Sequence, residues 1–179
     1  MKKSEFLWIF LVVLVVIVLT YVNLSAALLR SRDLQRRNDI QAIADGLIAY
    51  FEDFSSYPQS SVDGKIMACN GPCEWGKDPL RDINDPDYPP YISTLPADPQ
   101  SATGASFYYL SSGRVFQLFT SLEGGVTAEE YNAEIAQRNL PCGNRVCSYG
   151  RAHAQAPLGK TIEEYEIEQR MKKLMNKVE

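Results

Sequence analysis

The sequence is poor in the residues from which most catalytic sites are built. Its 179 residues include one histidine, His153, and no cysteine, serine and carboxylate residues grouped at catalytic spacing. General acid–base and nucleophilic catalysis depend on such groups, so we expect neither an enzyme nor a small-molecule substrate. The formal charge of -4 comes with no basic run of the kind that grips a polyanion, which argues against a nucleic-acid partner.

Proline is absent before Pro58, and the only glycine in that stretch is Gly46, so nothing obliges a helix to end there. Charged residues are also absent from residue 6 to residue 29. As a helix these 24 residues would span about 36 Å, more than a hydrocarbon core of about 30 Å. We therefore predict a transmembrane helix over residues 6–29, preceded by a basic N-terminal tail, residues 1–5.

A cleavable signal peptide is the alternative to a retained helix, because Lys2 and Lys3 precede the apolar run. However, the run is longer than the usual apolar core of about 7–15 residues. The small-residue site Ser25-Ala26-Ala27 is also followed by more helical sequence rather than by a turn. We expect the segment to be retained as a membrane anchor.

The four cysteines form two short pairs, each in a glycine-containing turn. Cys69 and Cys73 enclose CNGPC, and Cys142 and Cys147 enclose CGNRVC. In a small exported domain such pairs favour the local disulfides Cys69–Cys73 and Cys142–Cys147. Linkage between the two turns, a four-cysteine zinc site and free thiols are the alternatives.

The orientation in the membrane depends on two opposing signals. Arginines at positions 30, 32, 36 and 37 slightly outweigh the positive charge at the N-terminal side, which taken alone favours a cytoplasmic C-terminal domain. The paired cysteines favour export. We expect a single-pass protein of the cell membrane whose head is extracytoplasmic.

Beyond the apolar run, residues 30–55 have the pattern of an amphipathic spine helix. Apolar residues recur there at steps of three and four, as on one buried helical face. Ser55-Ser56-Tyr57-Pro58 is a stop signal, so we predict one continuous helix over residues 6–54. The residues of the expected buried face are Ile40, Ile43, Ala44, Leu47, Ile48, Phe51 and Phe54.

Residues 56–150 form the expected head, and the fold class is α+β. Seven of the ten prolines fall in residues 59–100, which indicates an irregular loop. Residues 105–110 and 115–120 read as a β-hairpin with the four-residue loop 111–114. The long helix would pack on this small antiparallel sheet.

Two Thr-x-x-Glu capping boxes predict short helices near the C-terminus. Thr127 and Glu130 would open a helix to about Asn139, and Thr161 and Glu164 a second one to about Val178. We assign residues 151–179 to a linker and this C-terminal amphipathic helix. Its apolar side either packs on its own domain or faces a partner.

Several segments together carry a resemblance to a known superfamily. In their order they resemble the type IV pilins and type II secretion pseudopilins, in the style of the major pseudopilin, over roughly residues 6–123. The segments are the apolar N-terminal helix, Arg32 to Ile40 with Ile48 to Phe51, Ser56-Tyr57-Pro58, Tyr91 to Pro99, Phe107-Tyr108-Tyr109, Phe116-Gln117-Leu118 and Leu122-Glu123.

The resemblance implies a pilin-like fold and a non-enzymatic subunit that is held in the membrane by its helix. Such subunits assemble by bundling their helices in a filament core, with other pilin-like subunits or the secretion or pilus machinery as partners. The N-terminus departs from the pattern, because no glycine precedes the apolar run as a cleavage signal. We therefore expect the helix to stay uncut, so that Lys2 and Lys3 remain at the membrane surface.

Glu5 is the candidate assembly residue. The family glutamate lies within the apolar run and pairs with the freed amine of a neighbouring subunit. Here Glu5 lies just before the run, where it either stays hydrated as an interfacial residue or makes such a contact.

An acidic loop is a further candidate for a metal site. Asp78, Asp82, Asp85 and Asp87 place four carboxylates within ten residues, and calcium binds such oxygen ligands. The resemblance also points to calcium, since major pseudopilins hold it in a C-terminal loop. The spacing is not that of an EF-hand, and a solvated acidic turn is the alternative.

Two functions remain. The first is a membrane-anchored pilin-type subunit or accessory factor of a type II secretion or type IV pilus-like system. The second is a non-polymerising, single-pass binding module with a pilin-derived head. The uninterrupted helix favours the first, and the missing glycine favours the second.

Overall fold

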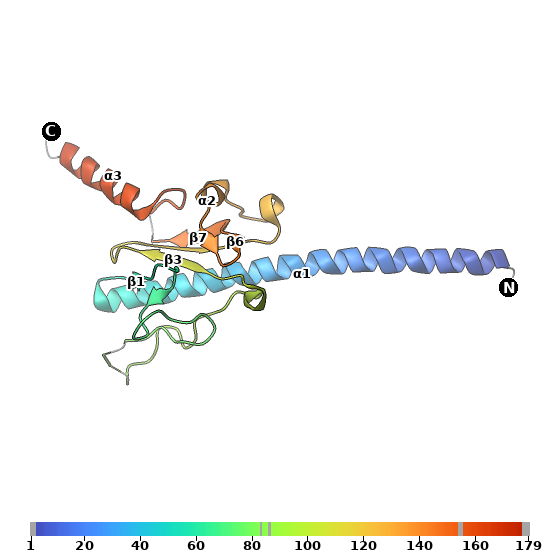
Figure 1. Ribbon diagram of the computed structural model, residues 1–179, viewed down its shortest axis with the longest axis horizontal. Helices are drawn as coiled ribbons and strands as arrows, with labels where there is room; N and C mark the ends of the chain where they lie inside the picture. The colour runs from blue at the N-terminus through green and yellow to red at the C-terminus, as the bar shows by residue number, and fades with distance from the viewer. Residues whose placement is uncertain (1–2, 83, 86, 154–155, 177–179) are drawn as a thin grey trace.

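A single helix runs through the molecule and carries the head at one end (Figure 1). The computed structural model describes residues 3–82, 84–85, 87–153 and 156–176. Helix α1 spans Lys3–Phe54, 52 residues without a break. The prediction of one continuous helix is confirmed.

The two halves of α1 have different surroundings. Every described side chain from Leu7 to Ser25 is exposed, and this half projects away from the head. By length and composition α1 is able to cross a membrane. The other half packs against the head. Gly46 is buried there so close to Ile92 that a Cβ at position 46 would overlap the Ile92 side chain. Ser55 ends the helix with a positive φ of 53°.

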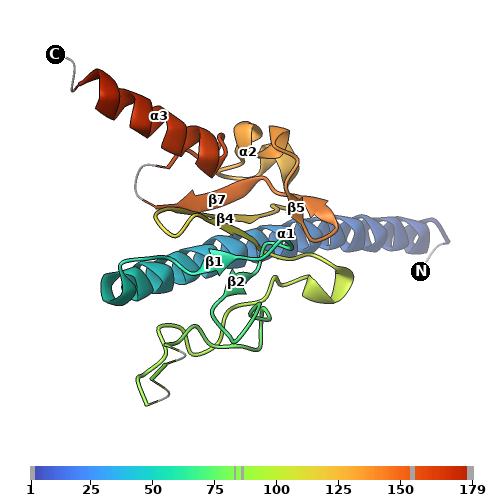
Figure 2. The same cartoon turned by 60° about the vertical axis from the view of Figure 1, so that its left-hand side comes forward.

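A three-stranded antiparallel sheet covers one face of α1 (Figure 2). Its strands are β3 (Tyr108–Ser111), β4 (Phe116–Thr120) and β7 (Tyr149–Ala152), in the order β3-β4-β7. The predicted hairpin is present, and Ser111 pairs with Phe116, so its loop is one residue later than expected.

Strand β7 was not predicted, and it crosses the expected boundary between head and linker. Its sequence, Tyr-Gly-Arg-Ala, has few residues of high β propensity. Gly150 is suited to the position because a Cβ there would lie 2.6 Å from the carbonyl oxygen of Leu118 on β4. The strand is therefore selected by tertiary packing.

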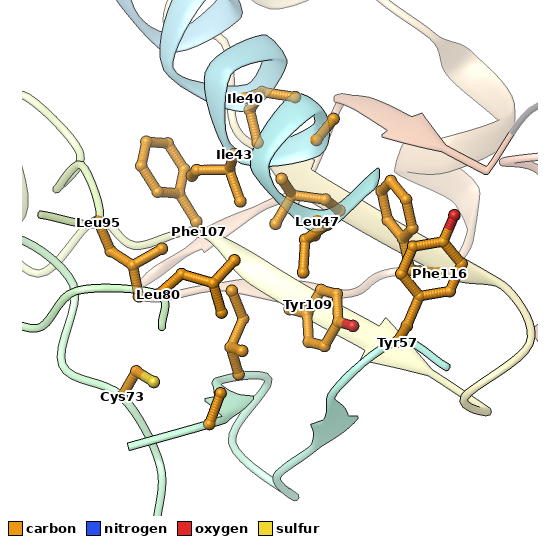
Figure 3. Close-up of a cluster of buried hydrophobic side chains, with 14 of the residues drawn as sticks. Ile40, Ile43, Leu47, Tyr57, Cys73, Leu80, Leu95, Phe107, Tyr109 and Phe116 are labelled. Atoms are coloured by element: carbon orange, nitrogen blue, oxygen red, sulfur yellow. The ribbon is translucent and has the colours of Figure 1, made fainter. Parts of the chain in front are cut away.

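The core lies between α1, the sheet and the irregular loop (Figure 3). Ile48, expected on the buried face, is 43% exposed, because the head covers one side of α1 and Ile48 lies past its edge. The fully or nearly fully buried side chains include Ile40, Ile43 and Leu47 of α1, Tyr109, Phe116 and Leu118 of the sheet, and Leu80, Leu95 and Phe107.

Two small hairpins flank this core, each associated with a disulfide. They are β1 (Gln59–Ser60) with β2 (Ile66–Met67), and β5 (Pro141–Cys142) with β6 (Arg145–Val146). The disulfides join Cys69 to Cys73 and Cys142 to Cys147, and none of the four cysteines is free. Neither cross-turn linkage nor a cysteine zinc site occurs in this arrangement.

The predicted helix from Thr127 to Asn139 is wrong in its start. Gly125–Thr127 is a short 3-10 turn, η2, and Glu130 has a φ of 65°, which interrupts any helix there. Helix α2 is only Ala133–Gln137, and its cap is Asn132, whose side chain accepts the N–H groups of Glu134 and Ile135. Local capping by asparagine prevails over the Thr-x-x-Glu pattern. A second 3-10 turn, η1, spans Ser101–Thr103.

Helix α3 (Ile162–Met175) begins with the predicted capping box, Thr161 with Glu164. The expected continuation to Val178 lies outside the described residues. Helix α3 extends from the head at the end opposite the N-terminus (Figure 1), and none of its residues is buried. Its exposed apolar side chains are Ile167, Met171, Leu174 and Met175.

Replacing either cysteine pair by alanine should lower the stability of the head. Closing a loop this short contributes about 2 kcal/mol through the unfolded state. Cys142 and Cys147 are also fully buried against Phe119 and Ile135, so we expect their loss to cost more than loss of Cys69–Cys73. Thermal unfolding of the 179-residue chain in mild detergent, followed by near-UV circular dichroism, measures both. A larger loss for Cys69→Ala/Cys73→Ala would contradict this ranking.

Candidate functional site at the base of the head

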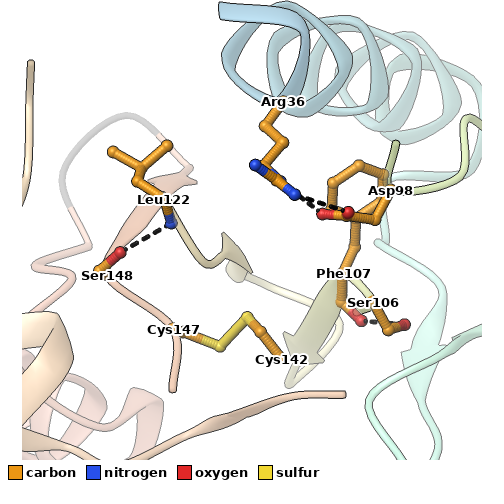
Figure 4. Close-up of a disulfide and its surroundings, with 8 residues drawn as sticks. All are labelled: Arg36, Asp98, Ser106, Phe107, Leu122, Cys142, Cys147 and Ser148. Carbon is orange, nitrogen blue, oxygen red and sulfur yellow. Dashed lines mark hydrogen bonds and ion pairs between the residues drawn. A yellow bond between two sulfur atoms is a disulfide. The ribbon is translucent and has the colours of Figure 1, made fainter. Parts of the chain in front are cut away.

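Arg36 lies at the centre of a buried ion cluster, which consists of Arg32, Asp33, Arg36, Asp98 and Glu123. The Arg36 side chain is 0% exposed. Its guanidinium binds the Asp98 carboxylate with two hydrogen bonds, Nε to Oδ2 at 2.7 Å and Nη2 to Oδ1 at 3.0 Å (Figure 4). Such paired geometry is the strongest form of charge-assisted bonding.

Glu123 joins two arginines of α1 on successive turns. It accepts Nη1 of Arg36 at 2.6 Å, and Nε and Nη2 of Arg32 at 2.8 and 2.6 Å. Burial alone would lower the pKa of Arg36, but its hydrogen bonds to Asp98 and Glu123 outweigh that effect and raise it. Hydrogen bonds from Arg32, supported by Arg36, lower the pKa of Glu123 to about 2 against the opposing effect of burial.

Asp33 connects the helix to the backbone that follows β4. Its carboxylate accepts Nη1 of Arg36 at 2.9 Å and the N–H groups of Glu123 and Gly124 at 2.8 and 3.0 Å. The segment after β4 is also held to the residue before β7, because the N–H of Leu122 donates to Oγ of Ser148 at 2.9 Å (Figure 4). The acceptors and donors of the ion cluster are thus used within it, which suits the cluster to fixing the head on α1 rather than to transferring protons.

The ion cluster unites three segments that are distant in sequence. They are the start of the spine, the Leu-Pro-Ala-Asp-Pro loop that contains Asp98, and the Leu122-Glu123 pair. All three segments contribute to the resemblance to pilins, but the sequence did not predict that they meet. A signal was present, because Arg36 is one turn before Ile40 on the buried face, and a buried arginine requires carboxylate partners.

A groove borders the ion cluster where the exposed half of α1 begins. Its volume is about 580 Å³. One wall is α1 from Ala26 to Arg37, and the other is the 123–129 loop after β4. The lining residues are Ala26, Leu29, Arg30, Asp33, Arg37, Glu123, Gly124, Thr127, Ala128 and Glu129.

The predicted calcium ligands do not converge. Asp78 accepts the N–H of Glu74, Asp82 that of Asn84, and Asp85 that of Asp87, so these carboxylates close local turns. Among the described residues no three acidic, histidine or cysteine side chains are grouped to hold a metal ion. The structure therefore gives no support to the calcium expectation for Asp78, Asp82, Asp85 and Asp87, which stays a prediction, because three of these carboxylates each close a local turn.

Glu5, the candidate assembly residue, and His153, the single histidine, have simple placements. Glu5 is within α1, and its side chain lies outside the described part of the structure. His153 lies with Nδ1 2.6 Å from Oη of Tyr57, a hydrogen bond that fixes the end of β7 near the start of the head.

Compared with protein-family models, curated proteins and solved structures, the chain has no match. The resemblance to pilins is therefore carried by the motifs of the chain itself.

Replacing Arg36 by methionine should be the most damaging single change at this site. Asp98, Asp33 and Glu123 would each lose their buried partner, and the free energy of unfolding would fall by about 3–5 kcal/mol. The matched control is Arg37→Met, because Arg37 pairs with Glu129, whose side chain is 79% exposed, and should contribute less than about 1 kcal/mol. Thermal unfolding compares the two variants, and equal losses would contradict the central role of Arg36.

Acid should weaken the head through Glu123. Its pKa falls from the ordinary value of 4.5 to about 2 on folding, so its contribution is complete above pH 4.5 and is lost as the pH falls towards 2. The whole effect is about 3 kcal/mol. Glu123→Gln should abolish this part of the pH dependence, whereas Glu129→Gln should keep it. Unfolding temperatures measured across this pH range decide, and parallel curves for wild type and Glu123→Gln would refute the assignment.

Proposed function

We propose that this chain is a non-enzymatic, membrane-anchored pilin-like protein, a subunit or accessory factor of a type II secretion or type IV pilus-like system. The observation that carries the proposal is the division of α1. The described side chains from Leu7 to Ser25 in its first half are exposed, uncharged and mostly apolar, and its second half is bound into the head by the ion cluster. A helix of this kind suits anchorage in lipid and presentation of a head at the surface.

The cysteines bear on which side of the membrane the head lies. All four are in disulfides, and such bonds persist in oxidising compartments. This supports an extracytoplasmic head on a single-pass protein of the cell membrane.

Partnership with other pilin-like subunits is supported by the uncovered face of α1. Past the edge of the head, Leu34 and Ile48 are 51% and 43% exposed. An uncovered helical face that continues from the lipid-facing segment is suited to contact with another helix.

The second candidate function is a binding module that does not polymerise. The specific observation in its favour is α3, which extends away from α1's exposed half and presents Ile167, Met171, Leu174 and Met175. An amphipathic helix with such spacing docks into an apolar groove of a partner.

Photo-cross-linking distinguishes the two functions. We would place a photoreactive side chain at Ile48, at Leu174, and at Val62, a more accessible control that is 96% exposed in the turn between β1 and β2. In membranes that contain a secretion or pilus machinery, the subunit function predicts adducts from Ile48 with pilin-like chains. Adducts from Leu174 with an unrelated protein, and none from Ile48, would favour the binding module instead.

A further inference from the structure

We propose that the 123–129 loop is a second membrane contact, which places Val126 in the lipid headgroup region and brings a lipid phosphate to Arg30. This inference rests on the proposed insertion of α1 in a membrane. Phospholipid headgroups of the same bilayer occupy the groove.

The level of the bilayer surface is marked on α1 itself. Arg30 is the first charged residue after the apolar run. Among the described residues before it, Ala26 and Leu29 are partly covered, whereas those from Leu7 to Ser25 are all exposed. The 123–129 loop covers these two residues, because it lines the groove together with Ala26 and Leu29. The head therefore reaches about one helical turn, about 6 Å, beyond Arg30 into the apolar segment.

The loop is held firmly in this position. Asp33 accepts the N–H groups of Glu123 and Gly124, and Oγ1 of Thr127 donates to the carbonyl oxygen of Gly124 at 2.8 Å. In Figure 1 this loop is the yellow-orange turn on the side of the head that faces the projecting half of α1. Its fixed backbone presents a single apolar side chain, Val126, which is 78% exposed. An apolar side chain held at this level is suited to the boundary between headgroups and acyl chains.

The charges of the groove leave one cation for lipid. Glu123 is bound by Arg32 and Arg36, and Asp33 by Arg36 and two backbone N–H groups. Arg37 faces the exposed carboxylates Glu129 and Glu130 at 3.1 and 3.8 Å. Across the part of the chain that the structure describes, Arg30 makes no such ion pair, although it lines the groove. A guanidinium at a bilayer surface binds lipid phosphate.

The consequence is a defined orientation of the head relative to the bilayer. Helix α1 alone would leave open the direction in which the head tilts relative to the bilayer. With Val126 as a second point of contact, the head is held against the bilayer on the side of the 123–129 loop.

The test uses the 179-residue chain in vesicles of phosphatidylcholine with or without phosphatidylglycerol. Because all four native cysteines are in disulfides, a single added cysteine labels selectively with an environment-sensitive fluorophore. The labelled variants are Val126→Cys, Val15→Cys in the apolar run, and Leu174→Cys on α3, which is 60% exposed and lies at the far end of the head. Quenching by a nitroxide at headgroup depth is compared among them.

We expect headgroup nitroxide to quench the label at 126 at least about twofold more than the label at 174. Arg30→Gln in the Val126→Cys background should remove the additional quenching that phosphatidylglycerol produces. A label at 126 that behaves like the one at 174, while Val15→Cys is shielded in lipid, overturns this inference alone. A label at position 15 that remains accessible to an aqueous quencher overturns membrane anchorage and this inference together.

Discussion

The position of the head depends on the buried charge of Arg36. A guanidinium without water is costly unless its hydrogen bonds are met by carboxylates, and here three carboxylates from three segments meet them. Asp33 comes from the same helix, Asp98 from the irregular loop and Glu123 from the end of the sheet. Because removing any one carboxylate takes hydrogen bonds from the buried guanidinium, the ion cluster favours a single way of joining the head to α1 in addition to the apolar packing above it.

The helix and the hairpin were accessible from the sequence because local signals determine them. A run without proline, a period of three to four, and the Ser55 to Pro58 stop define α1, and the Thr161–Glu164 box defines the start of α3. Where local signals compete, prediction failed: Asn132 rather than Thr127 caps α2. Strand β7 contains Gly150 and Arg151, and only its pairing with β4 makes it a strand. No local pattern predicts such pairing.

The candidate site was harder to predict for the same reason. Its residues are spread over about ninety positions, from Arg32 to Glu123. Their charges alone do not distinguish a solvated surface from a buried cluster. The acidic loop shows the converse, because Asp78, Asp82 and Asp85 are close in sequence but each caps its own turn. Density of charge in sequence was a poor guide to convergence in space, whereas the place of Arg36 on the buried face was the better signal.

The absence of any interruption in α1 makes it a rigid lever. No proline or glycine lies between Leu29 and Ile40, and the core side chains Ile40, Ile43 and Leu47 are on the same helix as the apolar run. A tilt of the apolar half is therefore transmitted unchanged to the head. From Leu29 to Phe54 is about 38 Å, so a tilt of about 10° moves the far end of the spine by about 7 Å. Since membrane helices tilt to match bilayer thickness, the proposed insertion of α1 would let the thickness of the bilayer govern the reach and direction of the outermost helix.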